Sequence, residues 1–389
     1  MPTQEALSIS ESYLSPSRLQ IRSIETLIVD LPIKRPHQFS ATRITTQAYL
    51  IVKVLTEDGL IGVGEGATPG GPWWSGDSIE TMKEMIDTYL APALIGESAV
   101  RITHLHNRMN RVAFGNSFAK AAIDMALWDV LGKSLKVPTH ALFGGQVRDK
   151  SEISWALATN KADTDIAEAE SMLDRRLARV FKLKGGALPP EEDVHRAVAV
   201  AKAMDGKAEI RIDLNQAWDE ATARRWLPTL LDSGVTLIEQ PVQGWNIDAL
   251  ARLRTMFNVR IMADESLTTL QSALQITSLA AADVLALKLM KSGGLTACRQ
   301  ISGIAEAAGI ATYGGTFLEG SLGTSAGLQL VAAERSLSYG SEYIGGIWLA
   351  DEIVTHPLVY KDFHVEVPSG PGLGMTLDED KISHFRRKS

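Results

Sequence analysis

Five charged residues recur at a nearly constant interval in the second half of the chain. They are Lys184, Asp213, Glu239, Asp264 and Lys288, spaced 24 to 29 residues apart, each at the end of a short apolar run. One interval is about the length of a strand and a helix together. In a barrel of parallel strands, successive strand ends surround one cavity at the carboxyl-terminal face, where such enzymes carry their active sites. The spacing therefore predicts that these side chains share one site.

The types of these residues indicate what the site would do. Three gathered carboxylates would raise each other's pKa unless a cation lay between them. Oxygen ligands on rigid strands, without Cys or His, suit Mg²⁺ or Mn²⁺. Such an ion could hold a substrate carboxylate and stabilise the ene-diolate formed when its α-carbon loses or gains a proton. A lysine whose pKa is lowered by neighbouring cations would carry that proton.

Neighbouring residues add to this set. Lys182 lies two positions before Lys184 and Asn215 lies two after Asp213, so each pair shares one face of its strand. A single Asp or Glu at a strand end more often caps the following helix. The joint spacing of five groups favours the metal site over five unrelated caps.

The segments that would position these residues alternate between short apolar runs and longer amphipathic stretches. The predicted strands are Ile153–Thr159, Val180–Lys184, Ile210–Asn215, Thr236–Gln240, Arg260–Glu265, Val284–Met290, Ile310–Gly314 and Tyr339–Ile344. Strands alternating with helices indicate an α/β fold with a parallel sheet. Eight units of this length favour a (β/α)8-type barrel. An open doubly wound sheet fits less well, because no glycine-rich phosphate turn follows the first strand.

The chain outside this barrel divides into three further parts. Residues 19–148 form an α+β domain, with strands at Ile21–Val29 and Ala48–Leu55, a hairpin turn at Glu57–Gly59, and helices at Asp77–Tyr89 and Phe118–Lys136. The barrel occupies residues 149–362. Residues 363–389, with a last strand at Phe363–Pro368, would return to the first domain. Residues 1–18 lack an apolar core and are expected to be a loose extension rather than a signal peptide.

Composition excludes several classes of protein. The 389 residues carry a net charge of −7 without a basic stripe, which excludes nucleic-acid binding as a function. No apolar run reaches the ~18 residues of a membrane helix. The single cysteine, Cys298, rules out a disulfide framework and suits a reducing, cytoplasmic setting.

Five short motifs resemble those of one known family. They are Lys182-Leu183-Lys184, Asp213-Leu214-Asn215-Gln216, Glu239-Gln240-Pro241, Met262-Ala263-Asp264-Glu265-Ser266 and Leu287-Lys288-Leu289. Together they closely resemble the muconate-lactonizing branch of the enolase superfamily. The resemblance runs from about Leu19 to Arg387. It implies a modified, (β/α)7β type of TIM-like barrel with an N-terminal α+β capping domain.

The resemblance implies a role for each site residue. The metal ligands, for one Mn²⁺ or Mg²⁺ per subunit, would be Asp213, Glu239 and Asp264. The catalytic set would be Lys184 as general acid and base, Lys288 on the opposite face of the substrate, Lys182, and Glu342 at the end of the eighth strand. Asn215 and Glu265 would support them.

The same resemblance assigns substrate selection to the first domain. Its segments Arg35–Thr46 and Gly66–Gly76 match two mobile loops that close over the barrel mouth. The residues expected to line the substrate pocket are Pro69 and Trp74 in the second loop and Ile344 after the eighth strand. Trp73 and Trp74 provide two indoles that could cover an apolar diene.

The implied reaction is lactonization of cis,cis-muconate, a small dicarboxylate, by a homo-oligomer that is often an octamer. Chloromuconate is the first alternative, because Trp74 and Ile344 resemble that type of enzyme. Dipeptide epimerase and o-succinylbenzoate synthase share the fold and both lysines. Epimerases usually carry Asp-x-Asp where this chain has the single acid Glu342, which argues against dipeptides. A metal-free Schiff-base aldolase would leave the three carboxylates unexplained.

Overall fold

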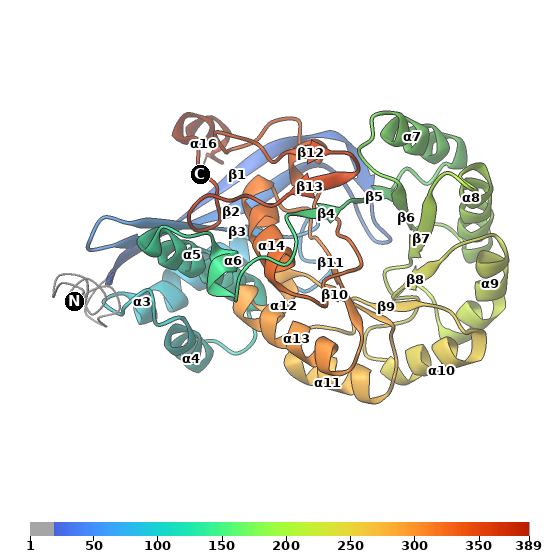
Figure 1. Ribbon diagram of the computed structural model, residues 1–389, viewed down its shortest axis with the longest axis horizontal. Coiled ribbons are helices and arrows are strands. Elements are labelled where there is room, and N and C mark those ends of the chain that lie inside the picture. Colours follow the sequence, from blue (N-terminus) through green and yellow to red (C-terminus); the bar gives the residue numbers. More distant parts are fainter. Residues whose placement is uncertain (1–18, 389) are drawn as a thin grey trace, which may run out of the picture.

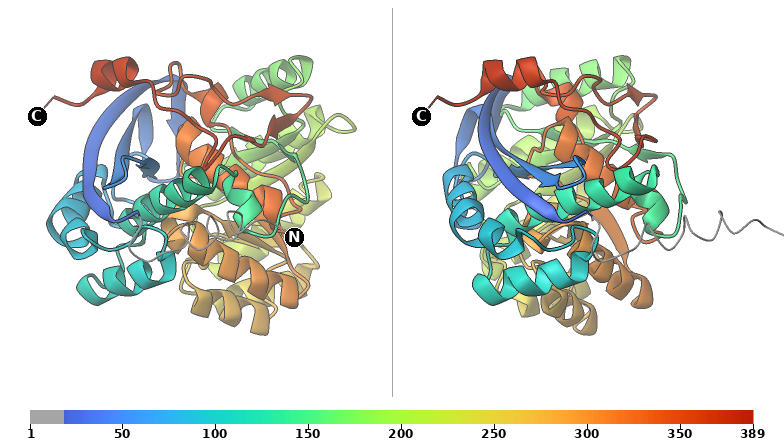
Figure 2. Two further views of the ribbon diagram at one scale, coloured as in Figure 1. Left: turned by 60° about the vertical axis from the view of Figure 1, so that its left-hand side comes forward. Right: turned by 90° about the vertical axis from the view of Figure 1, so that its left-hand side faces the viewer.

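A computed structural model describes residues 19–388, so the predicted extension at residues 1–18 lies outside the described part of the chain. A capping unit of antiparallel strands and helices lies against a curled parallel sheet that is wrapped by helices (Figure 1). The rotated views place the long strands of the cap and its helix α5 along one side of the barrel (Figure 2). None of the helices among residues 19–388 is long and apolar enough to cross a bilayer.

The cap is built on a three-stranded antiparallel sheet. Its strands, in spatial order, are β1 (Ile21–Gln38), β2 (Arg43–Thr56) and β3 (Ile61–Ala67). The predicted hairpin is confirmed between β2 and β3, where Gly59 takes a φ of +83° that favours glycine. The cap helices are α2 (Ile79–Met85), the π-helical turn η1 (Ile86–Leu90), α3 (Ala91–Leu94), α4 (Ile102–Val112), α5 (Ser117–Leu135) and α6 (Thr139–Leu142).

Helix α5 is buried along most of its length because it packs against β3 at very short range. A Cβ added at Gly64 of β3 would lie 2.0 Å from the Ala122 carbonyl oxygen of α5, and one at Gly62 would lie 2.2 Å from that of Ala126. The predicted helix at Phe118–Lys136 is thus confirmed. The glycines on β3 allow its close contact with the sheet.

Seven parallel strands form the barrel sheet. In order they are β5 (Ser154–Leu157), β6 (Val180–Lys184), β7 (Glu209–Asp213), β8 (Leu237–Glu239), β9 (Ile261–Ala263), β10 (Val284–Leu287) and β11 (Ala311–Gly314). The predicted strand at Tyr339–Ile344 is wrong. Only Ser341 forms bridges there, parallel to Ile153 on one side and Gly314 on the other. The chain turns into a helix directly afterwards, so a single residue closes the ring in place of an eighth strand.

Helices cover the outside of this sheet, and α7 to α11 form the outer arc of Figure 1. They are α7 (Ala162–Asp174), α8 (Pro190–Ala203), α9 (Glu220–Asp232), α10 (Ile247–Phe257), α11 (Leu270–Ser278), α12 (Leu289–Ser292), α13 (Leu295–Ala307) and α14 (Ser321–Ala333). The closing residue is followed only by the four-residue helix α15 (Gly345–Trp348). The end of β1 and α15 therefore occupy the flank where a (β/α)8 barrel would place its eighth helix.

The last part of the chain joins both units. The strand predicted at Phe363–Pro368 is β13 (His364–Glu366), and it pairs with β12 (Tyr360–Lys361) and β4 (Lys150–Glu152) at the start of the barrel, not with the cap sheet. Beyond it, α16 (Glu379–Phe385) packs on β1, and Arg387 donates its backbone N–H to Ile28.

Candidate active site

The five residues with barrel spacing converge at the carboxyl ends of five neighbouring strands. Lys184, Asp213 and Glu239 are the last residues of β6, β7 and β8. Asp264 directly follows β9, and Lys288 directly follows β10. All five side chains are buried. The prediction that they share one cavity is consistent with this placement.

Each of the two outer lysines contacts one carboxylate. The Lys184 Nζ lies 2.6 Å from Asp213 Oδ2, and the Lys288 Nζ lies 2.6 Å from Asp264 Oδ2. Opposite charges at this distance in a buried site interact far more strongly than at the surface. The two ammonium groups therefore approach the carboxylates from different strands, one from β6 and one from beyond β10.

Lys182 connects the middle of the site to its closing segment. Its Nζ lies 2.5 Å from Glu239 Oε2 and 2.6 Å from Glu342 Oε2, and its side chain is fully buried. Glu342 follows the bridging residue Ser341, so it reaches the site although no eighth strand is present. Its carboxylate is occupied by this contact.

A fourth lysine belongs to the cluster and was not predicted. Lys291, on α12, donates from Nζ to the side chain of Asp264 and to its backbone carbonyl, both at 2.6 Å. It lies three residues after Lys288, so both lysines face one side of a helical turn. Recognising that the apolar run ends at Leu287 and becomes helical would have revealed it.

Tight backbone turns hold the carboxylates at their strand ends. Asn215 and Gln240 both have positive φ values, +41° and +32°, which are rarely adopted by non-glycine residues. The Asn215 N–H donates to Asp213 Oδ1, and the Asn215 side chain donates to Glu265 Oε1. The Gln240 side-chain oxygen accepts from the Asp264 N–H. Strain of this kind persists only where surrounding contacts over-determine it, and it is concentrated at functional sites.

The carboxylates have shifted pKa values because they are buried together. Burial raises the pKa of Glu239 to about 7, and repulsion from Asp213 adds to this shift. Burial, with repulsion from Asp264 and Asp213, raises the pKa of Glu265 to about 8. Burial also acts on Asp264, but the adjacent ammonium groups of Lys288 and Lys291 outweigh it and hold its pKa low.

The pKa of Lys288 is raised in this structure. Burial lowers it, but the charges of Asp264 and Glu239 outweigh burial and raise the pKa above its ordinary value. This agrees with the expected role of Lys288 as a source of positive charge.

The donor set fits a hard divalent cation. Three buried oxygens in the site, Glu239 Oε1, Asn215 Oδ1 and Glu265 Oε2, have no hydrogen-bond partner. Within residues 19–388, no three Asp, Glu, His or Cys side chains already stand as a ready ligand group; the carboxylates contact ammonium groups instead. Five buried acids, the three predicted ligands with Glu265 and Glu342, face four buried lysines. With all five acids ionised, the cluster would carry one uncompensated negative charge, and a cation would offset it.

An aromatic pair covers each outer lysine. The Lys184 Nζ lies 5.8 Å from the centroid of the Phe39 ring, which packs on Trp73 at 5.4 Å. The Lys288 Nζ lies 4.7 Å from the Phe317 ring and 5.6 Å from the Trp74 ring. Trp74 meets Phe317 edge to face at 4.6 Å. The roof above both amines is therefore apolar.

The predicted lid residues occupy different places. Pro69 is buried and its carbonyl accepts from Trp73 Nε1 at 2.6 Å, which braces the loop after β3. The predicted loop at Arg35–Thr46 is wrong in extent, because β1 runs to Gln38 and β2 starts at Arg43. Ile344 lies directly before α15 and lines one pocket with Arg35 and His37, which belong to the first predicted loop.

Comparisons with known proteins agree with this arrangement. Residues 23–144 match the family described as mandelate racemase/muconate lactonizing enzyme, N-terminal domain, and residues 164–381 match enolase C-terminal domain-like. The chain is 43% identical to a chloromuconate cycloisomerase of Cupriavidus pinatubonensis, over 93% of this chain and 98% of that protein. It is 43% identical to muconate cycloisomerase 1 of Rhodococcus opacus, over 95% and 99%.

Solved structures give the same result. The muconate lactonizing enzyme of Pseudomonas fluorescens, complexed with muconolactone, superposes with a TM-score of 0.93 at 42% identity, over 95% of this chain and all of that one. The 2-chloromuconate cycloisomerase of Rhodococcus opacus 1CP gives the same TM-score, identity and coverage. The chain belongs to the muconate-lactonizing branch of the enolase superfamily. It is an enzyme of this family by sequence and by fold.

Three residues of the site in this muconate-lactonizing family member were not predicted from the sequence: Lys291, Phe39 and Phe317. Lys291 lies just beyond the predicted strand Val284–Met290 and was given no role, and Phe39 and Phe317 were not singled out. Phe317 lies three residues after the predicted strand Ile310–Gly314, at a barrel strand end, which was a usable signal. Phe39 directly follows the cap strand β1 and lies within Arg35–Thr46, the segment predicted to close over the barrel mouth, but no pattern in the sequence pairs it with Lys184.

Proposed function

We propose that this chain is a muconate cycloisomerase, which converts cis,cis-muconate into a lactone. The observation that carries the proposal is the pair of buried lysines, Lys184 and Lys288, that approach the central carboxylates from different strands beneath an aromatic roof. Two amines on opposite sides of a planar substrate suit proton transfer at one of its carbons. Full-length relatives named as muconate and chloromuconate cycloisomerases support the same reaction.

Asp213, Glu239 and Asp264 would hold one divalent cation, Mn²⁺ or Mg²⁺. When bound, that ion supplies charge stabilisation for a carboxylate whose α-carbon gains or loses a proton. The lysines that contact these carboxylates in the structure would then be released from them and turn toward the substrate.

The reaction needs one proton and no other reagent. One carboxylate oxygen of muconate adds to the distal double bond, a C–O bond forms, and the electron pair moves to the carbon next to the other carboxylate. The Lys184 ammonium gives its proton to that carbon. Lys288 contributes positive charge from the other side. Lys182 keeps Glu239 and Glu342 in place by contacting both.

The roof suits an apolar diene and is compatible with both muconate and chloromuconate. Trp73, Trp74, Phe39 and Phe317 offer rings and no charge above the lysines. A change of one methyl-sized group in such a pocket discriminates by about 1–3 kcal/mol. Chloromuconate therefore stays the second candidate substrate, and relatives with both names support keeping it.

The epimerase alternative is disfavoured by a contact. An epimerase needs acidic groups free to bind the substrate ammonium, whereas Glu342 already lies 2.6 Å from Lys182. We keep o-succinylbenzoate synthase as a further alternative because it would use the same lysines. A cytoplasmic homo-oligomer remains our expectation from the family likeness.

A single assay tests the proposal. Enzyme with added Mn²⁺ is mixed with cis,cis-muconate, 2-chloromuconate or 3-chloromuconate, and loss of the diene absorbance is followed along with chloride release. We expect turnover of muconate, with the chloromuconate rates ranking the second candidate. No loss of absorbance with any of the three, combined with racemisation of a dipeptide, would replace the cycloisomerase by an epimerase.

A further inference from the structure

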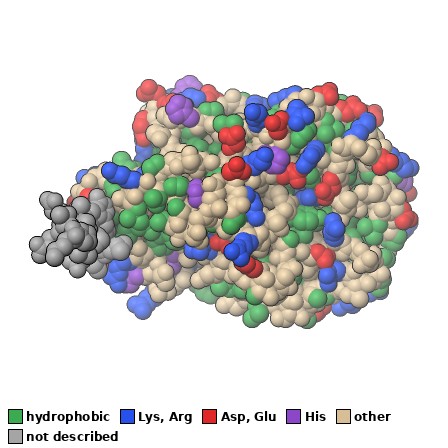
Figure 3. All heavy atoms as spheres, viewed as in Figure 1, with side chains coloured by type: hydrophobic (Ala, Val, Ile, Leu, Met, Phe, Trp, Pro, Cys, Tyr) green, Lys and Arg blue, Asp and Glu red, His purple; other side chains and the backbone are tan. Residues whose placement is uncertain are grey.

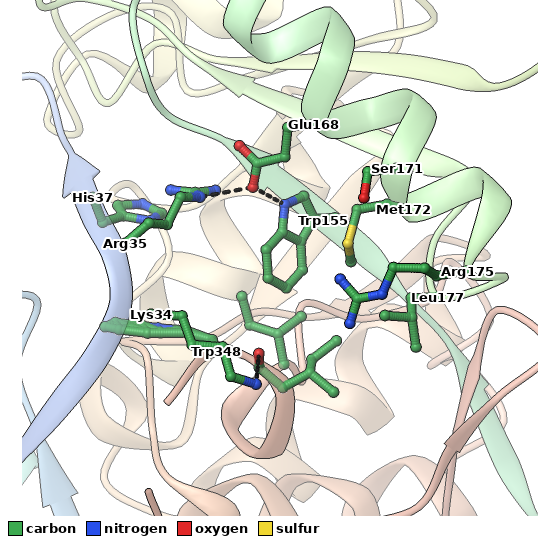
Figure 4. A pocket seen from close by; sticks show the side chains of 12 residues that line it. Lys34, Arg35, His37, Trp155, Glu168, Ser171, Met172, Arg175, Leu177 and Trp348 are labelled. Atoms are coloured by element: carbon green, nitrogen blue, oxygen red, sulfur yellow. Dashed lines mark hydrogen bonds and ion pairs between the residues drawn. The ribbon is translucent and has the colours of Figure 1, made fainter. Parts of the chain in front are cut away.

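A pocket opens on the flank of the barrel where the eighth helix is missing. It lies between the end of β1, strand β5, helix α7 and the short helix α15, and has a cavity volume of about 200 Å³ (Figure 4). A complete (β/α)8 barrel would fill this flank with a helix. The pocket is therefore a consequence of the helix that is missing after the closing residue Ser341.

Positive charge dominates the mouth of this flank pocket. Lys34, Arg35 and Arg175 line it, against one acid, Glu168. Glu168 Oε1 accepts from Arg35 at 2.7 Å and from Trp155 Nε1 at 2.8 Å, so the acid is already satisfied. The Arg175 side chain has no hydrogen-bond or ion-pair partner among residues 19–388, and Figure 4 shows it reaching from the end of α7 toward the middle of the pocket. The pocket carries a net positive charge and one free guanidinium.

Two buried polar groups in its wall also lack partners. His37 Nε2 and Trp348 Nε1 have no hydrogen-bond partner among the described residues, although these side chains are only 3% and 6% exposed. The two rings stack with 6.2 Å between their centroids. A buried indole N–H without an acceptor costs about 1–3 kcal/mol, but neither nitrogen is open to the solvent of the pocket. The Trp155 indole and the Ile344 side chain supply flat and apolar wall between these groups.

We propose that the flank pocket binds a small planar carboxylate, aromatic or conjugated, as a second ligand site of this enzyme. Its carboxylate would pair with the Arg175 guanidinium, while its flat body would lie against Trp155. Guanidinium and carboxylate groups match in planar, bidentate geometry. The proposal does not depend on which substrate the barrel mouth turns over.

The flank pocket is separated from the barrel mouth by two rings. His37, in the pocket wall, packs on Phe39 at 4.6 Å, and Phe39 faces Lys184. A ligand in the pocket would thus lie behind the wall of the catalytic centre rather than on the central carboxylates. Substitutions in the flank pocket should therefore affect the ligand bound there, and substitutions at the barrel mouth should affect the substrate.

Isothermal titration calorimetry of the full chain with benzoate as the probe tests the proposal. We expect wild-type enzyme to bind benzoate and Arg175→Ala to weaken binding by about tenfold or more, because one charge-assisted contact is lost. Arg225→Ala is the matched control, since Arg225 is exposed on α9 and lies against Trp226; it should bind as wild type does. Lys184→Ala should also retain binding.

A second variant tests the flat wall of the pocket without removing charge. Trp155→Leu keeps an apolar side chain at this position but deletes the ring, and we expect it to weaken benzoate binding severalfold. Circular dichroism confirms that each variant is folded. Benzoate binding that survives Arg175→Ala but disappears in Lys184→Ala places the ligand at the barrel mouth and overturns the proposal, as does a wild-type protein that binds no benzoate.

Discussion

The floor and the roof of the active site are built in opposite ways. The floor consists of buried ionised groups on strand ends and the turns after them, where each of the four lysines touches a carboxylate at 2.5–2.6 Å. The roof consists of rings, three of them from the cap, that make no ion pairs. Excluding water strengthens every charge interaction below such a roof. The comparison indicates that the barrel supplies the chemistry and the cap supplies selection.

The two regions also differ in how firmly they are held. Floor residues sit on strands and are braced by neighbouring side chains, as Gln240 braces Asp264. Trp74 in the roof lies on a loop between β3 and α2, half-buried, with a buried indole N–H that has no partner among the described residues. Rigid floors and adaptable lids are the usual division of labour in barrel enzymes.

Of the changes considered, removal of divalent cations should lower activity the most, and it acts on the floor and not on the roof. Treatment with EDTA should reduce turnover of muconate to background, because the three floor carboxylates would lose the charge that they are arranged to hold. Added Mn²⁺ or Mg²⁺ should restore activity and raise the melting temperature. Full activity in a preparation shown by elemental analysis to be metal-free would contradict the metal site.

Lys184→Ala should lower kcat by about 10²–10⁴-fold, the range typical for loss of a general acid. Lys288→Ala should lower kcat less, because its proposed contribution is charge alone. Lys207→Ala, at an exposed site away from the floor, is the control and should behave as wild type. If Lys288→Ala retains no activity while Lys184→Ala stays near wild type, the roles of the two faces are reversed.

Gly315→Ala should disturb the floor without removing a charge. A Cβ at Gly315 would lie 2.7 Å from Lys288 Cγ and 2.9 Å from its Cε, so the lysine must move away from Asp264. We expect kcat to fall by about 10- to 100-fold, since small misplacements of a reacting group are costly. Gly303→Ala is the matched control: it meets nothing within 4 Å and lies in α13. Equal kinetics for the two variants would show that the position of Lys288 is unimportant.

Trp74→Leu should have the smallest effect, confined to selection. Loss of the ring over Lys288 should raise KM for muconate and change the ratio of kcat/KM between muconate and 3-chloromuconate by about tenfold. Trp245→Leu is the control, because Trp245 is 79% exposed. An unchanged ratio together with a large fall in kcat would assign Trp74 to the chemistry instead of to selection.

Much of the floor was predictable because the ends of successive barrel strands recur at regular intervals along the sequence. Asp213, Glu239 and Lys184 end their strands as the spacing predicted. The prediction failed where periodicity changed without a clear signal. The run Val284–Met290 reads as one apolar strand, but the chain becomes helical at Leu289, and this places Lys291 on Asp264. Periodicity alone does not separate a buried strand from the first turn of a buried helix.

The prediction of an eighth strand failed for a related reason. Tyr339–Ile344 has the composition of a strand, yet the sheet needs only Ser341 to close on both neighbours. Strand length is decided by the edges that are available for pairing, and these edges come from β5 and β11, far apart in sequence. The pocket on the barrel flank results from that closure, so no local sequence pattern predicted the pocket.

The sequence by itself determined the order of the helices and strands, the charged residue types of the active-site floor and their spacing along the chain. These features depend on local periodicity and on the chemistry of each side chain. The tertiary structure alone decided which lysine meets which carboxylate, that Phe39 from the cap lies over Lys184, and that α15 and β1 leave the barrel flank open. The physical reason is that these contacts join segments tens to hundreds of residues apart. Their partners are selected by packing across the whole fold, which no short stretch of chain encodes.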